Sequence, residues 1–186
     1  MEANIYLNGL KIENAKNTDN ILEIEGYICH WDDANLNHER VNSQTFDKFF
    51  ELYNANKLRP RLNYEHTDQI IGGVDEIVPF DRGLYMTAHL AKNVAIVRDT
   101  IIPLIETGDL CSFSTECAVN YNDIEELQDN TYILHNAMLV GVAVVSQPAD
   151  PLATFSLKNF INEYKLQKQA EQEKINNSNS KFYLFF

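Results

Sequence analysis

Residues 62–90 read LNYEHTDQIIGGVDEIVPFDRGLYMTAHL, and this stretch indicates a β-rich fold. It contains three strand-like runs, at 62–64, 70–78 and 84–90, that are rich in β-branched and other apolar residues. The segment 79–83, Pro-Phe-Asp-Arg-Gly, lies between the last two runs and has the composition of a turn. We therefore expect three strands of a sheet in this part of the chain.

Similar strand patterns lie on both sides of this stretch. The further expected strands span residues 4–12, 21–28, 110–119 and 132–145. The last of these is the longest apolar stretch of the chain, an acidic loop at 123–129 precedes it, and Pro148-Ala149-Asp150-Pro151 ends the sheet. The pattern as a whole predicts about seven strands.

Two segments have helical periodicity. Ser43 is the expected N-cap of the first helix, whose apolar face carries Phe46, Phe49, Phe50 and Tyr53 at the spacing i, i+3, i+4 and i+7. The second helix runs through residues 94–107. Pro103 predicts a kink or an early break inside it, and Gly108 ends it.

The fold class that follows is α+β and mainly β. The chain divides into two segments. Residues 1–156 form the expected single compact domain, and residues 157–186 form a C-terminal tail. In the tail we expect a charged helix over 157–174, a flexible Asn/Ser-rich linker at 176–180 and an apolar peptide at 182–186. Such a tail is typical of a tether that ends in a docking peptide, or of a frayed terminus.

Composition excludes several classes of function. The formal net charge of −12 disfavours binding to nucleic acids and to anionic membranes. Three cysteines without CxxC spacing argue against a disulfide framework and a zinc site. The first residues lack the pattern of a signal peptide, and no apolar run approaches the roughly 20 residues of a membrane span. We therefore expect a cytoplasmic protein without a metal or cofactor.

His66 is the first candidate for chemistry. It follows a short strand and precedes a turn, a position from which an imidazole can project into a cleft. A metal site made of Glu65, His66 and Asp68 is disfavoured, because neighbours on a strand point to opposite faces. A structural histidine without a catalytic role is the alternative.

Ser114 is the second candidate. On a strand, Ser112, Ser114 and Glu116 share one face. A serine next to an imidazole is the minimum pairing for acyl transfer. The alternative is that these serines line an exposed face of the sheet and have no chemical role.

The order and spacing of several short pieces resemble a known family. The pieces are Gly26-Tyr27-Ile28, Tyr64-Glu65-His66, residues 71–77 and 81–85, the strand with Ser114, and residues 148–153. This succession, over about residues 20–155, resembles the prohead maturation proteases of tailed bacteriophages, which are similar in fold to the herpesvirus assemblins. The resemblance implies a partly closed β-barrel flanked by helices.

The same resemblance implies a function. It predicts a serine endopeptidase that cleaves phage scaffold and major capsid proteins inside the immature capsid, in the cytoplasm of the host bacterium. His66 matches the family's general base and Ser114 its nucleophile, while Ser112 stands where the family usually has glycine and is the second choice. No cofactor is implied, and the assemblin likeness allows a homodimer.

One position departs from the family pattern. The strand before Pro148 usually carries an acidic residue or a histidine that orients the catalytic histidine, and Gly141 stands there. The candidates to replace it are Glu116, about 7 Å along the strand from Ser114, and His135, roughly 20 Å along the strand from Gly141. Otherwise the chain is a slow dyad, an inactive scaffold or assembly factor of the same fold, or a small β-domain that binds peptides.

Overall fold

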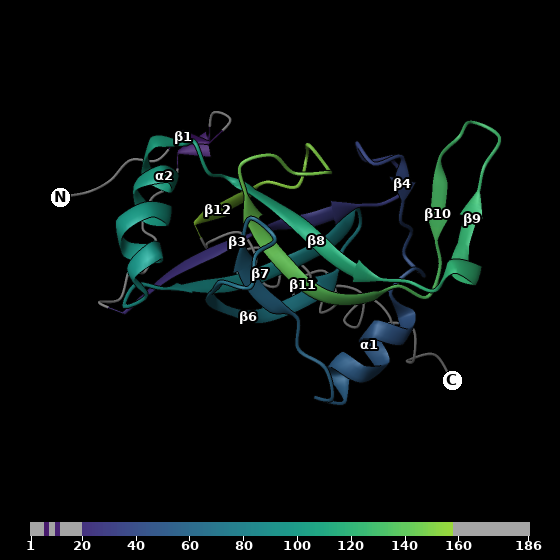
Figure 1. Cartoon of the computed structure of the whole chain (residues 1–186), viewed down its shortest axis with the longest axis horizontal. Helices are drawn as coiled ribbons and strands as arrows, with labels where there is room; N and C mark the ends of the chain where they lie inside the picture. Colours follow the sequence, from purple (N-terminus) through teal and green to yellow (C-terminus); the bar gives the residue numbers. More distant parts are fainter. Residues whose placement is uncertain (1–5, 8–9, 12–19, 158–186) are drawn as a thin grey trace, which may run out of the picture.

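The computed structural model describes residues 6–7, 10–11 and 20–157, and a seven-stranded sheet forms most of this part (Figure 1). The strand order is β12-β3-β7-β6-β5-β11-β8. The strands are β3 (Ile21–His30), β5 (Arg61–Tyr64), β6 (Ile70–Pro79), β7 (Gly83–Ala91), β8 (Ser112–Ala118), β11 (Met138–Val145) and β12 (Phe155–Leu157). Neighbours are antiparallel except β5 and β11, which are parallel. The three strands expected within 62–90 are thereby confirmed.

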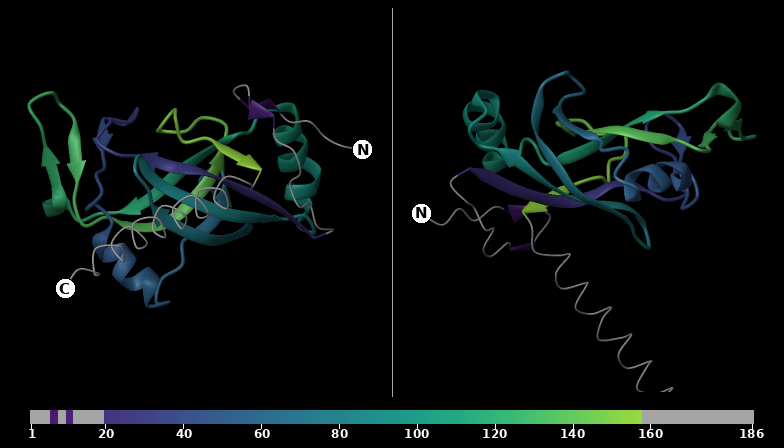
Figure 2. Two further views of the ribbon diagram at one scale, coloured as in Figure 1. Left: turned by 180° about the vertical axis from the view of Figure 1, so that it is seen from behind. Right: turned by 90° about the horizontal axis from the view of Figure 1, so that it is seen from below.

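The sheet curls until its two edges meet at a seam between β8 and the residues that lead into β12 (Figures 1 and 2). At this seam the amide of Phe113 donates to the carbonyl of Ala153 at 2.8 Å, and the amide of Phe155 donates to the carbonyl of Cys111 at 2.9 Å. At the same seam, the ring centroids of Phe113 and Phe155 lie 4.9 Å apart. The prediction of a partly closed, mainly β barrel is therefore confirmed.

The core fills the inside of the curl. Alternate residues of the strands point inward, and the largest fully buried side chains include Ile24, Ile28, Leu62, Leu84, Met86, Leu90 and Phe113. Helix α1 (Asp47–Asn54) adds Phe49 and Tyr53, both buried. Each fully buried side chain of this size contributes about 1.5–3 kcal/mol through removal from water. This core holds β5, β8 and β11 at fixed positions relative to one another.

Two small sheets lie outside the barrel. β10 (Tyr132–Leu134) pairs in parallel with β4 (Glu39–Arg40) and antiparallel with β9 (Ile124–Glu126), forming a hairpin that projects from the body (Figure 1). A short 3₁₀ turn, η2 (Tyr121–Asp123), leads into β9. The second small sheet is the pair β1 (Tyr6–Leu7) and β2 (Leu10–Lys11).

Three strand predictions need correction. The run 132–145 is wrong as a single strand, because the chain breaks between β10 and β11, where Asn136 has φ +51°. Tertiary bonds at 2.8 Å fix the break: the amide of Ala137 donates to the carbonyl of Thr45, and Asn136 Nδ2 donates to a carboxylate oxygen of Asp123. The acidic segment at 123–129, expected as a loop, contains the strand β9. The segment 4–12, expected as one strand, contains two short paired strands, β1 and β2.

The helices follow the sequence prediction apart from one cap and one break. Ser43 is wrong as an N-cap, since α1 begins at Asp47 after an irregular turn in which Asn42 Oδ1 accepts from two backbone amides. An early break at Pro103 is also wrong, because the helical chain continues through this residue to Thr107. A π-helical segment, η1 (Val97–Ile101), precedes α2 (Ile102–Thr107), because proline offers no N–H and crowds the preceding turn. Gly108 ends α2 at φ +81°.

The predictions for the tail fall almost wholly outside the described residues. β12 runs to Leu157, one residue past the expected domain boundary. The helix, linker and apolar peptide expected beyond it lie in 158–186, which the structure does not describe. Within the described ranges, no helix has the length and apolarity needed to cross a membrane.

Candidate active site

His66 sits on a tight turn in a strained backbone conformation. The turn spans Tyr64 to Thr67, with the amide of Thr67 donating to the carbonyl of Tyr64 at 3.0 Å. Glu65 and His66 have φ of +50° and +57°, the left-handed conformation at both central positions of a type I′ turn. Residues other than glycine and asparagine adopt it at a cost on the order of 1 kcal/mol each, and such strain is concentrated at functional sites.

Glu65 anchors this turn to the end of β11. Its amide donates to the carbonyl of Val144 at 3.1 Å, and its Oε1 accepts from the amide of Ser146 at 2.9 Å. These contacts on both ends of the residue offset the backbone strain and fix the place of the next residue, His66. The hydrogen bond with Ser146 also engages the Glu65 carboxylate, which was considered as a metal ligand. Among the described residues, no group of three side chains is suited to hold a metal ion.

The register of β8, β11 and β5 brings the candidate residues to one face of the sheet. Opposite residues on adjacent strands point to the same side. Two rows therefore cross the three strands on this face, namely Ser114–Ala143–Asn63 and Glu116–Gly141–Arg61. The turn with His66 directly follows β5, so the imidazole lies above this face.

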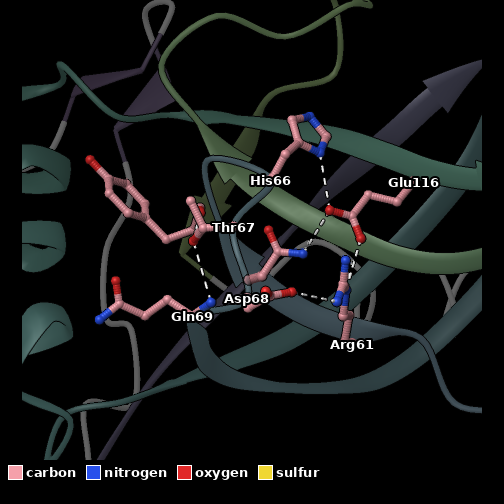
Figure 3. A network of polar contacts seen from close by, with 8 residues as sticks. Arg61, His66, Thr67, Asp68, Gln69 and Glu116 are labelled. Atoms are coloured by element: carbon pink, nitrogen blue, oxygen red, sulfur yellow. Dashed lines mark hydrogen bonds and ion pairs between the residues drawn. The ribbon is translucent and has the colours of Figure 1, made fainter.

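Glu116 receives a hydrogen bond from each of three side chains (Figure 3). Its Oε1 accepts from Asn63 Nδ2 at 2.8 Å and lies 3.1 Å from His66 Nδ1. Its Oε2 accepts from Arg61 Nε at 3.0 Å. Because an ionised carboxylate only accepts, the hydrogen in the contact with His66 belongs to Nδ1. The other ring nitrogen, Nε2, is then free to accept a proton.

The surroundings keep Glu116 ionised. Burial by itself would raise the pKa of the Glu116 carboxyl, whose side chain is only 13% exposed. Hydrogen bonds from Asn63, Arg61 and His66 outweigh that cost, and the pKa lies below its usual value. A negative charge is thus held beside the imidazole at neutral pH.

The Glu116 carboxylate occupies the space above Gly141. A Cβ atom on Gly141 would lie 2.1 Å from Glu116 Oε2 and 3.0 Å from Cγ of Arg61. Real Cβ atoms do not approach other atoms at 2.1 Å, so a side chain at this position would displace the carboxylate. With glycine at this position, the carboxylate lies over β11 in the place from which its Oε1 contacts His66.

Ser114 and Ser112 lie on the same face, and each is only 6% exposed. Ser112 belongs to the seam, where its backbone bridges Thr154, whereas Ser114 is one position nearer to Glu116 along the face. Among the described side chains, no hydrogen bond joins the Ser114 hydroxyl to His66. The structure thus brings His66, Ser114 and Glu116 to one face, without direct contact between His66 and Ser114.

A cavity of about 230 Å³ borders Ser114. Thr115 and Cys117 of β8 line it, as do His30 and Asp150, whose side chains are joined by a contact of 2.8 Å between Nδ1 and Oδ2. Burial alone would raise the pKa of Asp150, but the hydrogen bonds from His30 and from the backbone amide of Leu152 together outweigh it, and the pKa is lowered. The sequence had not singled out this pair, since its members lie 120 positions apart.

His135 is not brought to this site. It directly follows β10, outside the barrel, and its Nε2 lies 2.9 Å from Oε2 of Glu125. Of the two residues considered as replacements for Gly141, only Glu116 contacts His66. Sequence spacing alone missed this, because the carboxylate reaches His66 across strands and not along one strand.

Comparison with known proteins gives a family and a fold. The model of the family described as caudovirus prohead serine protease matches residues 9–167. No curated protein matches the sequence. The structure is similar to the capsid assembly protease of bacteriophage T4, with a TM-score of 0.55 and 16% identity, over 68% of this chain and 82% of that one.

Two herpesvirus proteases are more distantly similar. The varicella-zoster virus protease gives a TM-score of 0.44 at 14% identity, over 73% of this chain and 63% of that one. The KSHV protease, solved with a hexapeptide phosphonate inhibitor, gives 0.49 at 8% identity, over 76% of this chain and 66% of that one. At these identities, only the likeness to the T4 protein carries an argument, and it concerns the fold.

Proposed function

The chain belongs to the caudovirus prohead serine protease family, and on that premise we propose that it is a serine endopeptidase with Ser114 as nucleophile and His66 as general base. Membership makes it a capsid-maturation peptidase. The proposed substrates are the scaffold and major capsid proteins of a tailed phage, cleaved inside the immature capsid in the host. The observation that carries the assignment of residues is the contact of His66 Nδ1 with Glu116, which leaves Nε2 free as a base on the face that holds Ser114.

The proposed reaction is acyl transfer in two steps. Ser114 Oγ attacks the scissile carbonyl while His66 Nε2 takes its proton, and that proton then goes to the leaving amine. Water hydrolyses the acyl-enzyme in the second step, with His66 again as the base. One feature supports the proposal. The His66 side chain is 45% exposed and therefore accessible to substrate.

Bound substrate has to bring Ser114 and His66 together. Catalytic hydrogen bonds are often absent or long in free enzymes and tighten only in the complex with substrate. The proposal therefore requires the exposed imidazole to move toward the Ser114 hydroxyl while Nδ1 keeps its contact with Glu116.

An inactive scaffold or assembly factor is the second candidate function. It drew its support from Gly141, which leaves the catalytic histidine without an orienting group from β11. The contact between Glu116 and His66 weakens that support, because a carboxylate reaches the histidine from β8. This candidate, like the small peptide-binding β-domain, predicts no cleavage and no reaction of Ser114 with a serine-directed fluorophosphonate.

The decisive experiment is intact-mass spectrometry of cleavage reactions. The parent protein and its Ser114→Ala, His66→Ala and Ser112→Ala variants are each incubated with the scaffold and major capsid proteins of the same phage. We expect fragments from the parent and from Ser112→Ala, and none from the other two. Equal fragments from the parent and Ser114→Ala would place the nucleophile elsewhere, and fragments from none would favour the inactive scaffold.

The tail and the oligomeric state are separate proposals. We propose that residues 176–186 tether the protease to scaffold or capsid during assembly. Deleting 176–186 should then abolish packaging into capsids while cleavage in solution persists, and unchanged packaging would refute the tether. For the homodimer, sedimentation equilibrium should give twice the monomer mass of 21.4 kDa.

A further inference from the structure

The carboxylate beside His66 comes from an unexpected strand. Glu116 lies on β8, two residues from Ser114, and its backbone pairs with Gly141 on β11. Its carboxylate lies over Gly141. In the turn that follows β5 it meets His66 Nδ1 (Figure 3). Of the two opposed positions, 116 carries a carboxylate and 141 has no side chain. The Glu116 side chain can therefore pass over position 141 to reach His66.

We propose that Glu116 is the positioning residue of His66, and that it can act only because position 141 has no side chain. The proposal rests on Ser114 and His66 being the catalytic pair. Its first part assigns a role to Glu116. Its second part states a coupling between two positions, in which a side chain at 141 inactivates the site through Glu116 and not through any contact of its own with substrate.

The chemistry expected of Glu116 follows from its position. By accepting the Nδ1 hydrogen, the carboxylate fixes the tautomer in which Nε2 is the base, and it orients the ring. When His66 takes the proton from Ser114, the carboxylate also stabilises the positive charge of the imidazolium. A group with these two effects changes the rate of proton transfer and contributes little to substrate binding.

The neighbouring groups hold the carboxylate in place for this role. Asn63, which is fully buried, donates to the same oxygen that contacts His66, and Arg61 donates to the other. The other charged group near this network is Asp68, at 3.4 Å from Arg61 Nη1. Glu65, next to His66 in sequence, is engaged with Ser146 and is not available as a substitute. Glu116 is therefore the one carboxylate within hydrogen-bond distance of His66 among the described residues.

A double-mutant cycle tests both parts. The rate of labelling of the full chain by a serine-directed fluorophosphonate is measured for the parent, Glu116→Ala, Gly141→Ala and the double variant. In this reaction Ser114 Oγ bonds to phosphorus, fluoride leaves, and His66 accepts the hydroxyl proton. We expect Glu116→Ala to slow labelling about 10⁴-fold, the loss seen when a triad carboxylate is removed.

The coupling predicts that the two substitutions are not additive. Gly141→Ala should slow labelling nearly as much as Glu116→Ala, because its Cβ would overlap Glu116 Oε2 and push the carboxylate, together with the Oε1 that contacts His66, out of its position. In the Glu116→Ala background the same change should have no further effect, within about threefold. Glu125→Ala is the matched control, since it removes another glutamate that contacts a histidine, His135, outside the barrel, and labelling should not change.

The division between kcat and KM in capsid-protein cleavage separates positioning from a merely structural role. Loss of the carboxylate should lower kcat while KM stays the same, because Glu116 contacts the imidazole and not the substrate. Glu116→Gln keeps the size of the side chain and removes its charge. It should show the same fall in kcat at unchanged KM even if Gly141→Ala does not fold.

Each outcome has a distinct meaning. Loss of labelling in Ser114→Ala and His66→Ala, with the parent rate in Glu116→Ala, would overturn this inference and leave the proposed function intact. Multiplying effects of the two substitutions would refute the coupling. Labelling of Ser114→Ala at the parent rate would refute the proposed function itself, before any question about Glu116 arises.

Discussion

Phe113 should contribute more to stability than most core residues, because it joins the two edges of the barrel. Its side chain is 0% exposed, its ring lies 4.9 Å from that of Phe155, and its amide donates across the seam to Ala153. Replacing a buried phenylalanine with alanine costs about 3–5 kcal/mol. We therefore expect Phe113→Ala to lower the free energy of unfolding by about 4 kcal/mol.

The contact between the two rings adds a second, sharper expectation. An aromatic pair contributes about 0.5–1.5 kcal/mol beyond its buried area. The double variant Phe113→Ala/Phe155→Ala should therefore lose less stability than the sum of the single variants, by about 1 kcal/mol. A difference of this kind arises only if the two rings touch in solution, so it reports directly on closure of the seam.

Urea unfolding followed by fluorescence measures both quantities. The chain has one tryptophan, Trp31, whose ring lies 6.4 Å from that of Phe46 in the core and whose Nε1 donates to the carbonyl of Phe80. Leu36→Ala serves as the control, because this leucine is 69% exposed and should cost less than about 0.5 kcal/mol. If Phe113→Ala is unfolded without denaturant, Phe113→Leu replaces it, with an expected cost of about 1–2 kcal/mol.

Two results would refute this reasoning. A cost below about 1.5 kcal/mol for Phe113→Ala would mean that the ring is not enclosed as the structure has it. Strict additivity of the Phe113 and Phe155 substitutions would mean that the two edges of the sheet do not meet through these rings. Either result would also remove the basis for placing Ser112 within the seam.

Three further predictions concern pH, a thiol and a helix end. Burial alone would raise the pKa of Asp150, but hydrogen bonds from His30 and the amide of Leu152 together lower it. The resulting contribution to stability is present above the unfolded-state pKa of about 3.9 and lost as pH falls through the folded-state value. The free energy of unfolding should therefore fall more steeply below pH 4 in the parent than in Asp150→Asn, and parallel curves would contradict this. Burial raises the pKa of the Cys29 thiol, so iodoacetamide at pH 8 should modify Cys29 only after urea unfolds the chain, as peptide mass mapping would show. Gly108→Ala should cost about 1 kcal/mol from its positive φ alone, since no atom lies within 4 Å of the added Cβ, and an unchanged urea midpoint would refute this.

Local patterns were sufficient for most of the strands. The runs 70–78 and 84–90, which form β6 and β7, are bounded by turn residues and contain few residues that favour a structure other than a strand. Their ends were therefore predicted to within about one residue. The run 132–145 was wrong as one strand because its apolar pattern is continuous through a break that tertiary bonds to Thr45 and Asp123 impose. The return of the chain as β12 had no local signal, since strand pairing depends on the partner, β3.

For the candidate site, the sequence by itself determined the residue types and their places along the chain. It placed His66 after a strand, and it placed Ser114 and Glu116 on one face of another strand by the two-residue period of β-structure. It also showed Gly141 at the position where an acidic residue was expected.

Only the tertiary structure decided which group meets His66. The pairing of β8 with β11 sets Glu116 opposite Gly141, and the parallel pairing of β11 with β5 sets both beside Arg61. A shift of one residue in either register would place the side chains of Glu116 and Arg61 on opposite faces of the sheet. Register is fixed by the packing of the whole barrel, which no local stretch of sequence specifies, and for that reason the contact between Glu116 and His66 emerged only from the fold.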